Sequence, residues 1–239
     1  MDYIGSMRRL AASLLLLLTP CAAAAQSEGR VAAVTGPATL RLEDGRTVRL
    51  AGLLAWPEAQ ALLERLAPGR ALTLDADTRR DRHGRLAAQA KAEGVWLQQA
   101  LLEAGLARVL ALPDDGAPAG ELLAIEARAR AARTGLWADP RHRPLDAATP
   151  RGWGEGFALV EGTVREVARA KERTYLNFGA DRKTDFTAAV DDSRLGAFKA
   201  AGLDLSALAG RHVRVRGWLR SWNGPFLDLA HPQQIEVLE

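Results

Sequence analysis

The spacing of apolar and polar residues predicts short strands interrupted by a few amphipathic helices. Gly-Pro, Asp-Gly and Pro-Gly pairs mark turns between several of these segments. In the N-terminal half, strands are expected at 30–34, 39–42, 47–53, 71–76 and 86–92, and helices at 57–66, 95–104 and 120–134. This order makes a small α+β unit, and five short antiparallel strands of this kind favour an OB-type barrel.

A second unit with the same kind of pattern follows. Its strands are expected at 159–167, 174–178, 185–190, 213–219, 226–229 and 235–238. A helix at 193–201, with Ser193 as its N-cap, falls between the third and fourth strands. That connectivity favours a second, smaller OB-like β-barrel. We therefore expect a mixed α+β, mainly β chain with domains at 28–140 and 157–239, joined by a Pro- and Gly-rich linker at 141–156.

Residues 1–25 have the pattern of a signal peptide. Arg8 and Arg9 precede the apolar run Leu10–Leu18, and cleavage is expected near Ala25. The sequence thus predicts a periplasmic or secreted protein with no stable membrane anchor after cleavage. The single cysteine, Cys21, falls inside this segment. The mature chain is therefore expected to lack disulfides, thiolate metal sites and a cysteine nucleophile.

Charge and histidine content narrow the classes of function. A formal charge of +3 permits nucleic acid as a partner without requiring it. The four histidines do not have the spacing of metal ligands, so a zinc site is not expected. They are His83, His142, His212 and His231.

Four fragments in order carry a resemblance to a known family. They are VRLAGLLAWPEAQALL at Val48–Leu63, DRHGRLAAQ at Asp81–Gln89, GVWLQQALLEAGLARV at Gly94–Val109 and EARARAARTGLW at Glu126–Trp137. The segment from about Arg30 to Pro140 resembles the thermonuclease (staphylococcal nuclease-like) family. The resemblance implies an OB-type barrel with three helices, a calcium ion and phosphodiester hydrolysis.

The resemblance also implies roles for three residues. Arg49 and Arg85 match the arginines that bind phosphate, and Glu58 matches the glutamate assigned to activating water. Two calcium-ligand positions of the family hold Ala38 and Leu54 here, which have no side-chain oxygen.

These departures favour a degraded calcium site. No cofactor is expected, and calcium is expected only if the protein is an active nuclease. One extra residue before Pro57 shifts the register of Glu58. Asp75, Asp77 and Asp81 lie nearby in sequence but not at the family's ligand positions.

Several assignments stay open at this point. Arg49, Glu58 and Arg85 fit either a phosphate site or a buried ion-pair network that fills the old cavity. Asp81 fits a turn better than a catalytic role. Glu126 and Arg130, four residues apart on a helix, fit a surface pair or a domain-packing pair.

The second unit offers a candidate face for single-stranded nucleic acid, because OB barrels stack bases on aromatic side chains within basic grooves. Its residues are Tyr175, Phe178, Trp218, Trp222, Arg214, Arg216 and Arg220. The alternative places Arg214 and Arg216 on the solvent side of an ordinary alternating strand, with Trp218 in the core or under a loop.

Three functions follow. The first is an exported thermonuclease-like protein that retains binding of single-stranded nucleic acid or another phosphate anion. The second is an active nuclease, and the third is a structural or protein-interaction module.

Overall fold

The computed structural model describes residues 27–75, 79–111, 118–150, 152–181 and 183–238. The expected signal peptide, Cys21 and Asp77 lie outside these ranges. Among the described residues, no helix has the length and apolar character needed to cross a membrane. The prediction of a mixed α+β chain is confirmed.

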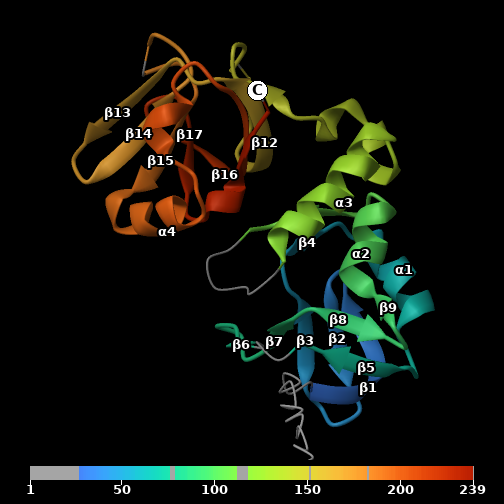
Figure 1. The fold of residues 1–239 in the computed structure, drawn as a ribbon. Coiled ribbons are helices and arrows are strands. Elements are labelled where there is room, and N and C mark those ends of the chain that lie inside the picture. Colours follow the sequence, from blue (N-terminus) through green and yellow to red (C-terminus); the bar gives the residue numbers. More distant parts are fainter. Residues whose placement is uncertain (1–26, 76–78, 112–117, 151, 182, 239) are drawn as a thin grey trace, which may run out of the picture.

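The N-terminal half forms a long curved sheet with the strand order β6-β7-β3-β2-β1-β5-β8-β9 (Figure 1). These strands are β1 (Ser27–Gly36), β2 (Thr39–Leu42), β3 (Thr47–Leu50), β5 (Ala71–Leu74), β6 (Arg79–Arg80), β7 (Leu86–Ala88), β8 (Ala90–Ala92) and β9 (Val95–Trp96). Two more strands, β4 (Leu53–Ala55) and β10 (Ala107–Val109), pair with each other.

Two expectations for these strands are wrong. The strand pairs are not all antiparallel. After the turn that follows β6, β7 pairs antiparallel with β6 and parallel with β3. The single strand expected at 86–92 is split at Gln89, where the chain leaves β3 and joins β5. The buried Gln89 side chain stabilises this crossing point by donating to the Ala51 carbonyl at 3.1 Å and accepting from the Trp96 indole at 3.0 Å.

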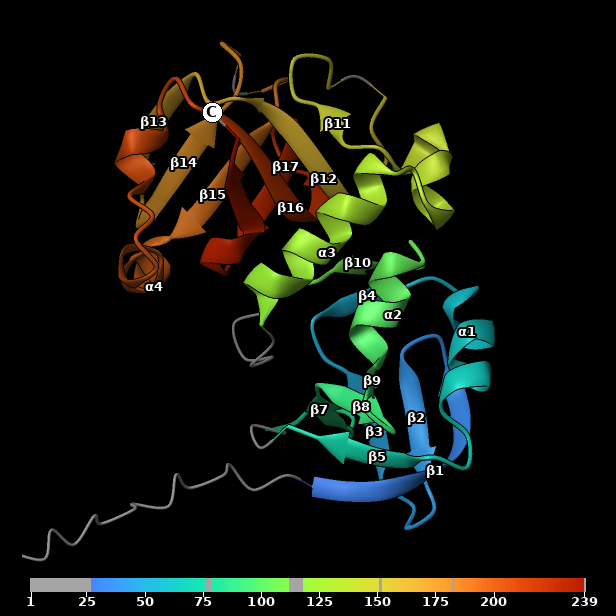
Figure 2. The ribbon, with the colours of Figure 1, turned by 45° about the vertical axis from the view of Figure 1, so that its right-hand side comes forward.

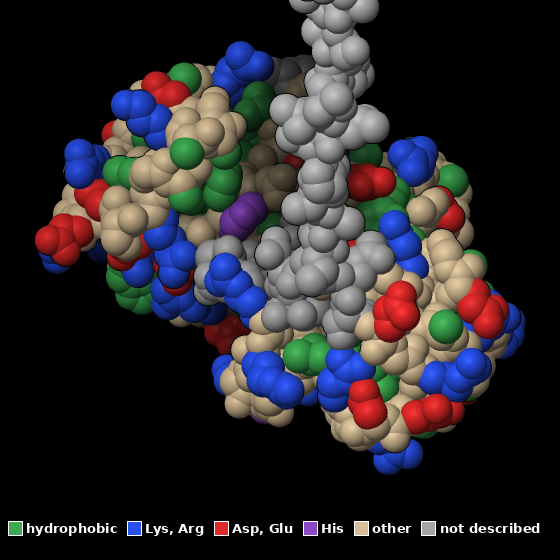
Figure 3. Space-filling view, turned by 60° about the horizontal axis from the view of Figure 1, so that its bottom comes forward, with side chains coloured by type: hydrophobic (Ala, Val, Ile, Leu, Met, Phe, Trp, Pro, Cys, Tyr) green, Lys and Arg blue, Asp and Glu red, His purple; other side chains and the backbone are tan. Residues whose placement is uncertain are grey.

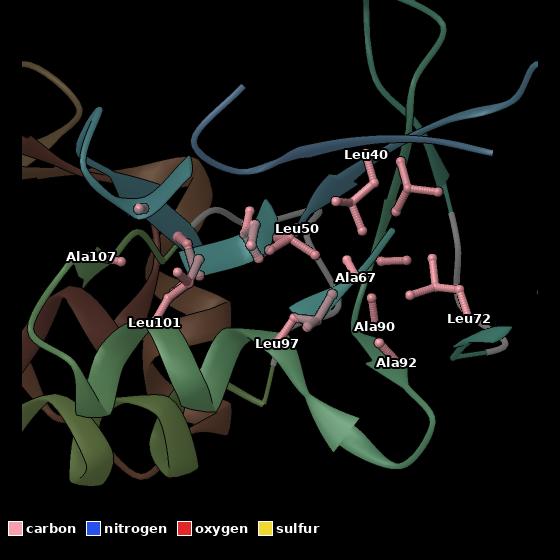
Figure 4. Packing of buried hydrophobic residues seen from close by; sticks show 14 of the residues in the cluster. Leu40, Leu50, Ala67, Leu72, Ala90, Ala92, Leu97, Leu101 and Ala107 are labelled. Atoms are coloured by element: carbon pink, nitrogen blue, oxygen red, sulfur yellow. The ribbon is translucent and has the colours of Figure 1, made fainter. Parts of the chain in front are cut away.

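The N-terminal half has three helices, α1 (Ala59–Leu66), α2 (Leu97–Glu103) and α3 (Ala119–Ala131). Helices α1 and α2 pack on this sheet, and α3 packs on α2 and β10. Helix α2 begins later than predicted because Val95 and Trp96 pair with β8 as a strand. Figure 4 shows Leu97 and Leu101 of α2 pointing toward the strands that carry Leu50 and Ala90, and all four are fully buried. Burial of each such leucine contributes about 1.5–3 kcal/mol relative to exposure.

The C-terminal half forms a second sheet, strongly curled into a half-barrel. Its order is β11-β12-β16-β17-β15-β14-β13, with β18 (Ile235–Val237) also pairing with β16. The bounds are β11 (Leu145–Asp146), β12 (Gly156–Thr163), β13 (Glu166–Ala170), β14 (Arg173–Asn177), β15 (Thr187–Asp191), β16 (His212–Ser221) and β17 (Pro225–Leu229). A helix, α4 (Leu195–Ala200), lies between β15 and β16 in the sequence, and β15 pairs with β17 in parallel.

The expected N-cap of the helix in this half is wrong. Residues Asp192–Arg194 form a separate 3₁₀ turn, which Asp191 caps by accepting the Ser193 N–H at 3.0 Å. The α-helix starts only at Leu195, because Asp191 caps the 3₁₀ turn that precedes it. Its one buried side chain, Phe198, joins the core that Phe186 and Leu227 also form.

Helix α3 lies between the two halves in both ribbon views (Figures 1 and 2). A small buried cluster of Ala129, Trp137 and Leu159 connects α3 to β12. The segment expected to be a linker contains the 3₁₀ helix Pro140–His142 and β11, and β11 pairs in parallel with β12. The two halves therefore share a packed junction, while the exact domain boundaries stay a prediction.

Candidate functional site

The structure brings Arg49 and Arg85 together around one carboxylate. Arg49 on β3 lies with its Nε 3.5 Å from Asp81 Oδ2, and Arg85 forms both an Nε and an Nη2 contact to that oxygen at 2.8 Å. The side chain of Asp81 is only 15% exposed. Two guanidinium groups thus share one carboxylate.

The turn between β6 and β7 positions that carboxylate. Asp81 Oδ1 accepts the backbone N–H groups of His83 at 2.9 Å and Arg85 at 3.0 Å. Gly84 has a φ of +74°, which a residue with a Cβ rarely adopts. Burial raises the pKa of Asp81, but the hydrogen bonds from Arg85 and His83 outweigh it and hold that pKa at about 2. Asp81 is therefore a turn residue, as expected, and also the counterion of both arginines.

Glu58 lies elsewhere. It is exposed at the N-terminal end of α1, and none of the ion pairs among the described residues includes it. Its carboxylate is instead one of the charges that act on His142, which contacts Trp56 edge-on at a centroid distance of 5.5 Å. The structure therefore does not join Glu58 to the arginine pair, and the catalytic role implied for it stays a prediction.

The donors required by calcium are absent from the two family positions. Ala38 packs against the hydrophobic core, and Leu54 is a half-buried residue of β4 opposite Arg108. The described residues contain no group of three or more His, Cys, Asp or Glu side chains that is able to hold a metal ion. Asp81, the nearest carboxylate to the arginines among these residues, already has two cations as partners. Calcium prefers six to eight oxygen ligands, so this donor set does not fit it.

Further basic residues surround the arginine pair on the same turn. We call residues 79–85 the arginine turn; Arg79, Arg80 and Arg82 are exposed in it, together with His83. Arg80 donates to the Gly84 carbonyl at 2.8 Å, which fixes its direction along the turn. Figure 3 shows basic and acidic side chains interspersed over one face of the molecule.

A buried ionic network lies at the junction of the two halves. Arg216 on β16 is 1% exposed and donates to Glu126 of α3, which is 0% exposed, at 2.9 and 3.0 Å. Arg216 also binds Glu236 at 2.6 Å, and Glu126 accepts from Arg130 at 3.0 Å. Glu126 and Arg130 are therefore a domain-packing pair, one of the two alternatives that the sequence left open.

Arg108 is the junction residue that sequence reasoning missed. It is buried on β10, between Trp56 and Trp137, with its guanidinium carbon 5.0 Å from each ring centroid. It donates to the His142 carbonyl at 2.7 Å. Burial is the main reason that its pKa falls to about 10. The only signal in the sequence was an arginine within a short apolar strand, which is too common to identify such a site.

The candidate face of the C-terminal half is only partly assembled. Phe178 is buried against Phe186, at a centroid distance of 4.9 Å. Trp218 is 57% exposed, so its assignment to the core is wrong, because even positions of β16 face outward at this end of the strand. Tyr175 and Trp222 do line one pocket together.

The arginines of that face divide between two environments. Arg214 binds Glu161 at 2.6 Å and Glu236 at 3.1 Å, and Arg216 is buried as described above. Neither side chain therefore lies on the solvent side of an ordinary strand. Both bind carboxylates instead of lying beside the exposed aromatic residues. Arg220 remains beside Trp222, with its guanidinium carbon 5.5 Å from that ring.

Comparison with known proteins agrees with the sequence resemblance over part of the chain. Residues 56–139 match the family model described as Staphylococcal nuclease homologue, and no curated protein matches the chain. The match contains Glu58 and Arg85, lies after Arg49 and ends before the C-terminal sheet. Residues 56–139 are thus an SNase-like domain, related to the nuclease family.

Proposed function

We propose that this protein binds single-stranded nucleic acid through the arginine turn of its SNase-like domain and lacks an efficient calcium-dependent nuclease site. The observation that supports this best is the cluster of Arg49 and Arg85 on Asp81. These two arginines match the phosphate-binding arginines of the family, and the structure brings them side by side. Arg80 and Arg82 lie exposed on the same turn and supply further cations without adding a ligand for a divalent cation.

Catalysis has less support in the same geometry. Metal activation typically lowers the barrier to phosphodiester hydrolysis by several kcal/mol, and the described residues offer no oxygen cage for the ion. Glu58, the residue expected to activate water, forms no ion pair with Arg49 or Arg85 among the described residues. Phosphate binding needs only the cationic side chains, so it does not depend on a calcium site or on the position of Glu58.

The C-terminal half and the cellular location complete the proposal. An OB-type barrel is supported by the parallel pairing of β15 with β17 and by the position of α4 between β15 and β16. An exported location is supported by the pattern of residues 1–25 alone. In this proposal both halves contact one strand of nucleic acid.

A salt titration tests the proposed function. Binding of a fluorescent dT20 oligonucleotide is measured by anisotropy between about 50 and 200 mM salt, for the wild type and for Arg80→Ala/Arg82→Ala. Each phosphate contact contributes about 0.7 to the slope of log K against log salt for a single strand. The double variant is therefore expected to bind more weakly and to lower that slope by about 1.4.

The control removes the same number of exposed arginines from another surface. Arg128→Ala/Arg133→Ala changes two exposed residues near the end of α3 and should leave the slope unchanged. Equal losses in both double variants would show that only net charge matters. Undetectable binding by the wild type at 50 mM salt would leave the protein-interaction module as the better explanation.

A further inference from the structure

The C-terminal sheet contains an aromatic pocket of about 330 Å³ away from the arginine turn. Tyr175 on β14, Phe226 on β17 and Trp222 in the turn between β16 and β17 line it. Lys171, at the turn between β13 and β14, lines the same pocket. Phe226 is only 2% exposed and supports Trp222 from behind, so Tyr175 and Trp222 supply the ring surface. Two rings with a cation at the rim suit a planar ring bearing nearby negative charge.

A buried amide gives this pocket a specific polar group. Asn177 lines the pocket and is 3% exposed, yet its Nδ2 has no hydrogen-bond partner among the residues that the structure describes. Its Oδ1 accepts the Thr187 hydroxyl at 3.5 Å. Leaving a buried donor unsatisfied costs about 1–3 kcal/mol, so such groups usually have a partner in the functional state. The Nδ2 atom itself has no exposed surface, so a ligand with an acceptor at its edge would pair with it once the Asn177 side chain turns toward the pocket.

The local structure holds Trp222 in place before any ligand binds. Its ring contacts Phe226 edge-on at a centroid distance of 4.7 Å, and its backbone N–H donates to the Gly224 carbonyl at 2.8 Å. Asn223 and Gly224 both have positive φ, of 52° and 89°, which closes the turn tightly. Trp222 nevertheless remains 43% exposed, so it combines a fixed position with free apolar surface.

Two cations lie beside this tryptophan on the side of the sheet. Arg173 and Arg220 both bind Asp228, at 3.0 and 2.7 Å, and their guanidinium carbons lie 6.0 and 5.5 Å from the Trp222 ring. Two arginines thus share Asp228, and Asp191 is a further carboxylate that interacts with Arg173. The two guanidinium groups lie next to the Trp222 ring, where the phosphate of a bound nucleotide would lie.

We propose that this pocket binds one unstacked base of a single-stranded nucleic acid, which packs on Tyr175 and Trp222 and accepts a hydrogen bond from Asn177. The inference rests on the proposed function for its ligand class, but it concerns a different surface and the base rather than the phosphate chain. Base–aromatic packing does not require calcium or any group of the SNase-like domain.

The test compares ligands with and without bases. Affinities are measured by anisotropy for dT12 and for an abasic 12-mer with the same number of phosphates, and dTMP is titrated by quenching of tryptophan fluorescence. The wild type should bind dT12 more tightly than the abasic strand. Trp222→Ala should weaken dT12 binding about 5- to 150-fold, the range found for loss of one base–aromatic contact. It should hardly change binding of the abasic strand.

Two further variants separate the pocket from general effects. Trp218→Ala removes another exposed tryptophan of the same sheet, outside the pocket, and should leave dT12 affinity unchanged. Asn177→Leu keeps the side-chain volume but removes the donor, and should weaken dTMP and dT12 binding while thermal unfolding stays within a few degrees of the wild type. Equal effects of Trp222→Ala and Trp218→Ala would overturn the inference.

The remaining outcomes are also decisive. If dT12 binds but the abasic strand binds equally well, the pocket inference fails and the proposed function stands. If dTMP quenches in a Trp222-dependent manner but no oligonucleotide shows a salt-dependent arginine-turn contribution, the pocket stands and the proposed function fails. Binding of a neutral oligosaccharide with the same Trp222 dependence, without dTMP binding, would overturn the assignment to a base, as would absence of binding by every probe.

Discussion

Substitution of Arg216 by Met should lower the stability of the junction between the two halves more than substitution of a surface residue does. The side chain is 1% exposed and forms hydrogen bonds to both oxygens of Glu126 and to Glu236. Met has a similar length and no charge. The change therefore removes the cation while most of the apolar volume remains.

The magnitude follows from what is left behind. Glu126 is fully buried and would keep only the Val109 N–H at 2.6 Å and Arg130 at 3.0 Å as donors. Removing one partner of a buried ion pair typically costs about 3–5 kcal/mol. For a chain of this size that corresponds to a decrease in Tm of about 6–20 °C.

Urea unfolding followed by tryptophan fluorescence measures the loss. The matched control, Arg169→Met, breaks a surface pair in which the arginine is 69% exposed, and should cost about 1 kcal/mol or less. The double variant Arg216→Met/Glu126→Leu should be more stable than Arg216→Met alone, because no carboxylate is left unpaired in the junction. A cost below about 1 kcal/mol for Arg216→Met, or additive losses in the double variant, would refute the reasoning.

Two further predictions concern the SNase-like domain. Because the folded pKa of Asp81 is about 2 and its ordinary value is 3.8, its contribution to stability is present above about pH 4 and is lost as the pH falls toward 2. Asp81→Asn should therefore reduce stability at pH 7 and make the decrease between pH 4 and 2 shallower, as measured by urea unfolding at several pH values; an unchanged acid profile would contradict this. Gly105→Ala should destabilise strongly, because its φ is +64° and the new Cβ would meet the Thr134 carbonyl oxygen at 2.1 Å. Gly45→Ala, with a φ of +85° and no atom within 4 Å, should cost only the backbone strain of about 1–2 kcal/mol, and equal thermal shifts for the two variants would be inconsistent with the clash.

Much of the fold was predictable because local patterns dominate it. Leucines at helical spacing predicted the three N-terminal helices, and alternation predicted most strands. The errors occurred where tertiary contacts decide. Gln89 is polar and buried at a crossing point, and Val95 and Trp96 join a strand although they continue a helical pattern. The strand at Glu166–Ala170 was missed because its alternation is weak and its outer residues are charged.

The candidate site was less predictable for a physical reason. The resemblance identified Arg49 and Arg85, but the parallel pairing of β3 with β7 that brings them together was not predicted. That Asp81 rather than Glu58 is their partner depends on how the turn folds, because the same side chain caps the turn and pairs with both cations. Similarly, Arg214 and Arg216 alternate with apolar residues, as solvent-facing residues do. Only the packing of α3 against β16 reveals that Arg216 is buried against Glu126.

Calcium dependence tests the central claim most directly. Binding and cleavage of single-stranded DNA are measured with the full chain in 5 mM calcium chloride and in EDTA at matched ionic strength, together with a calorimetric titration of the protein with calcium. We expect the same DNA affinity in both buffers, no cleavage and no heat of specific calcium binding. Tight calcium binding with cleavage that requires both the ion and Glu58, and that Glu58→Gln abolishes, would contradict the account.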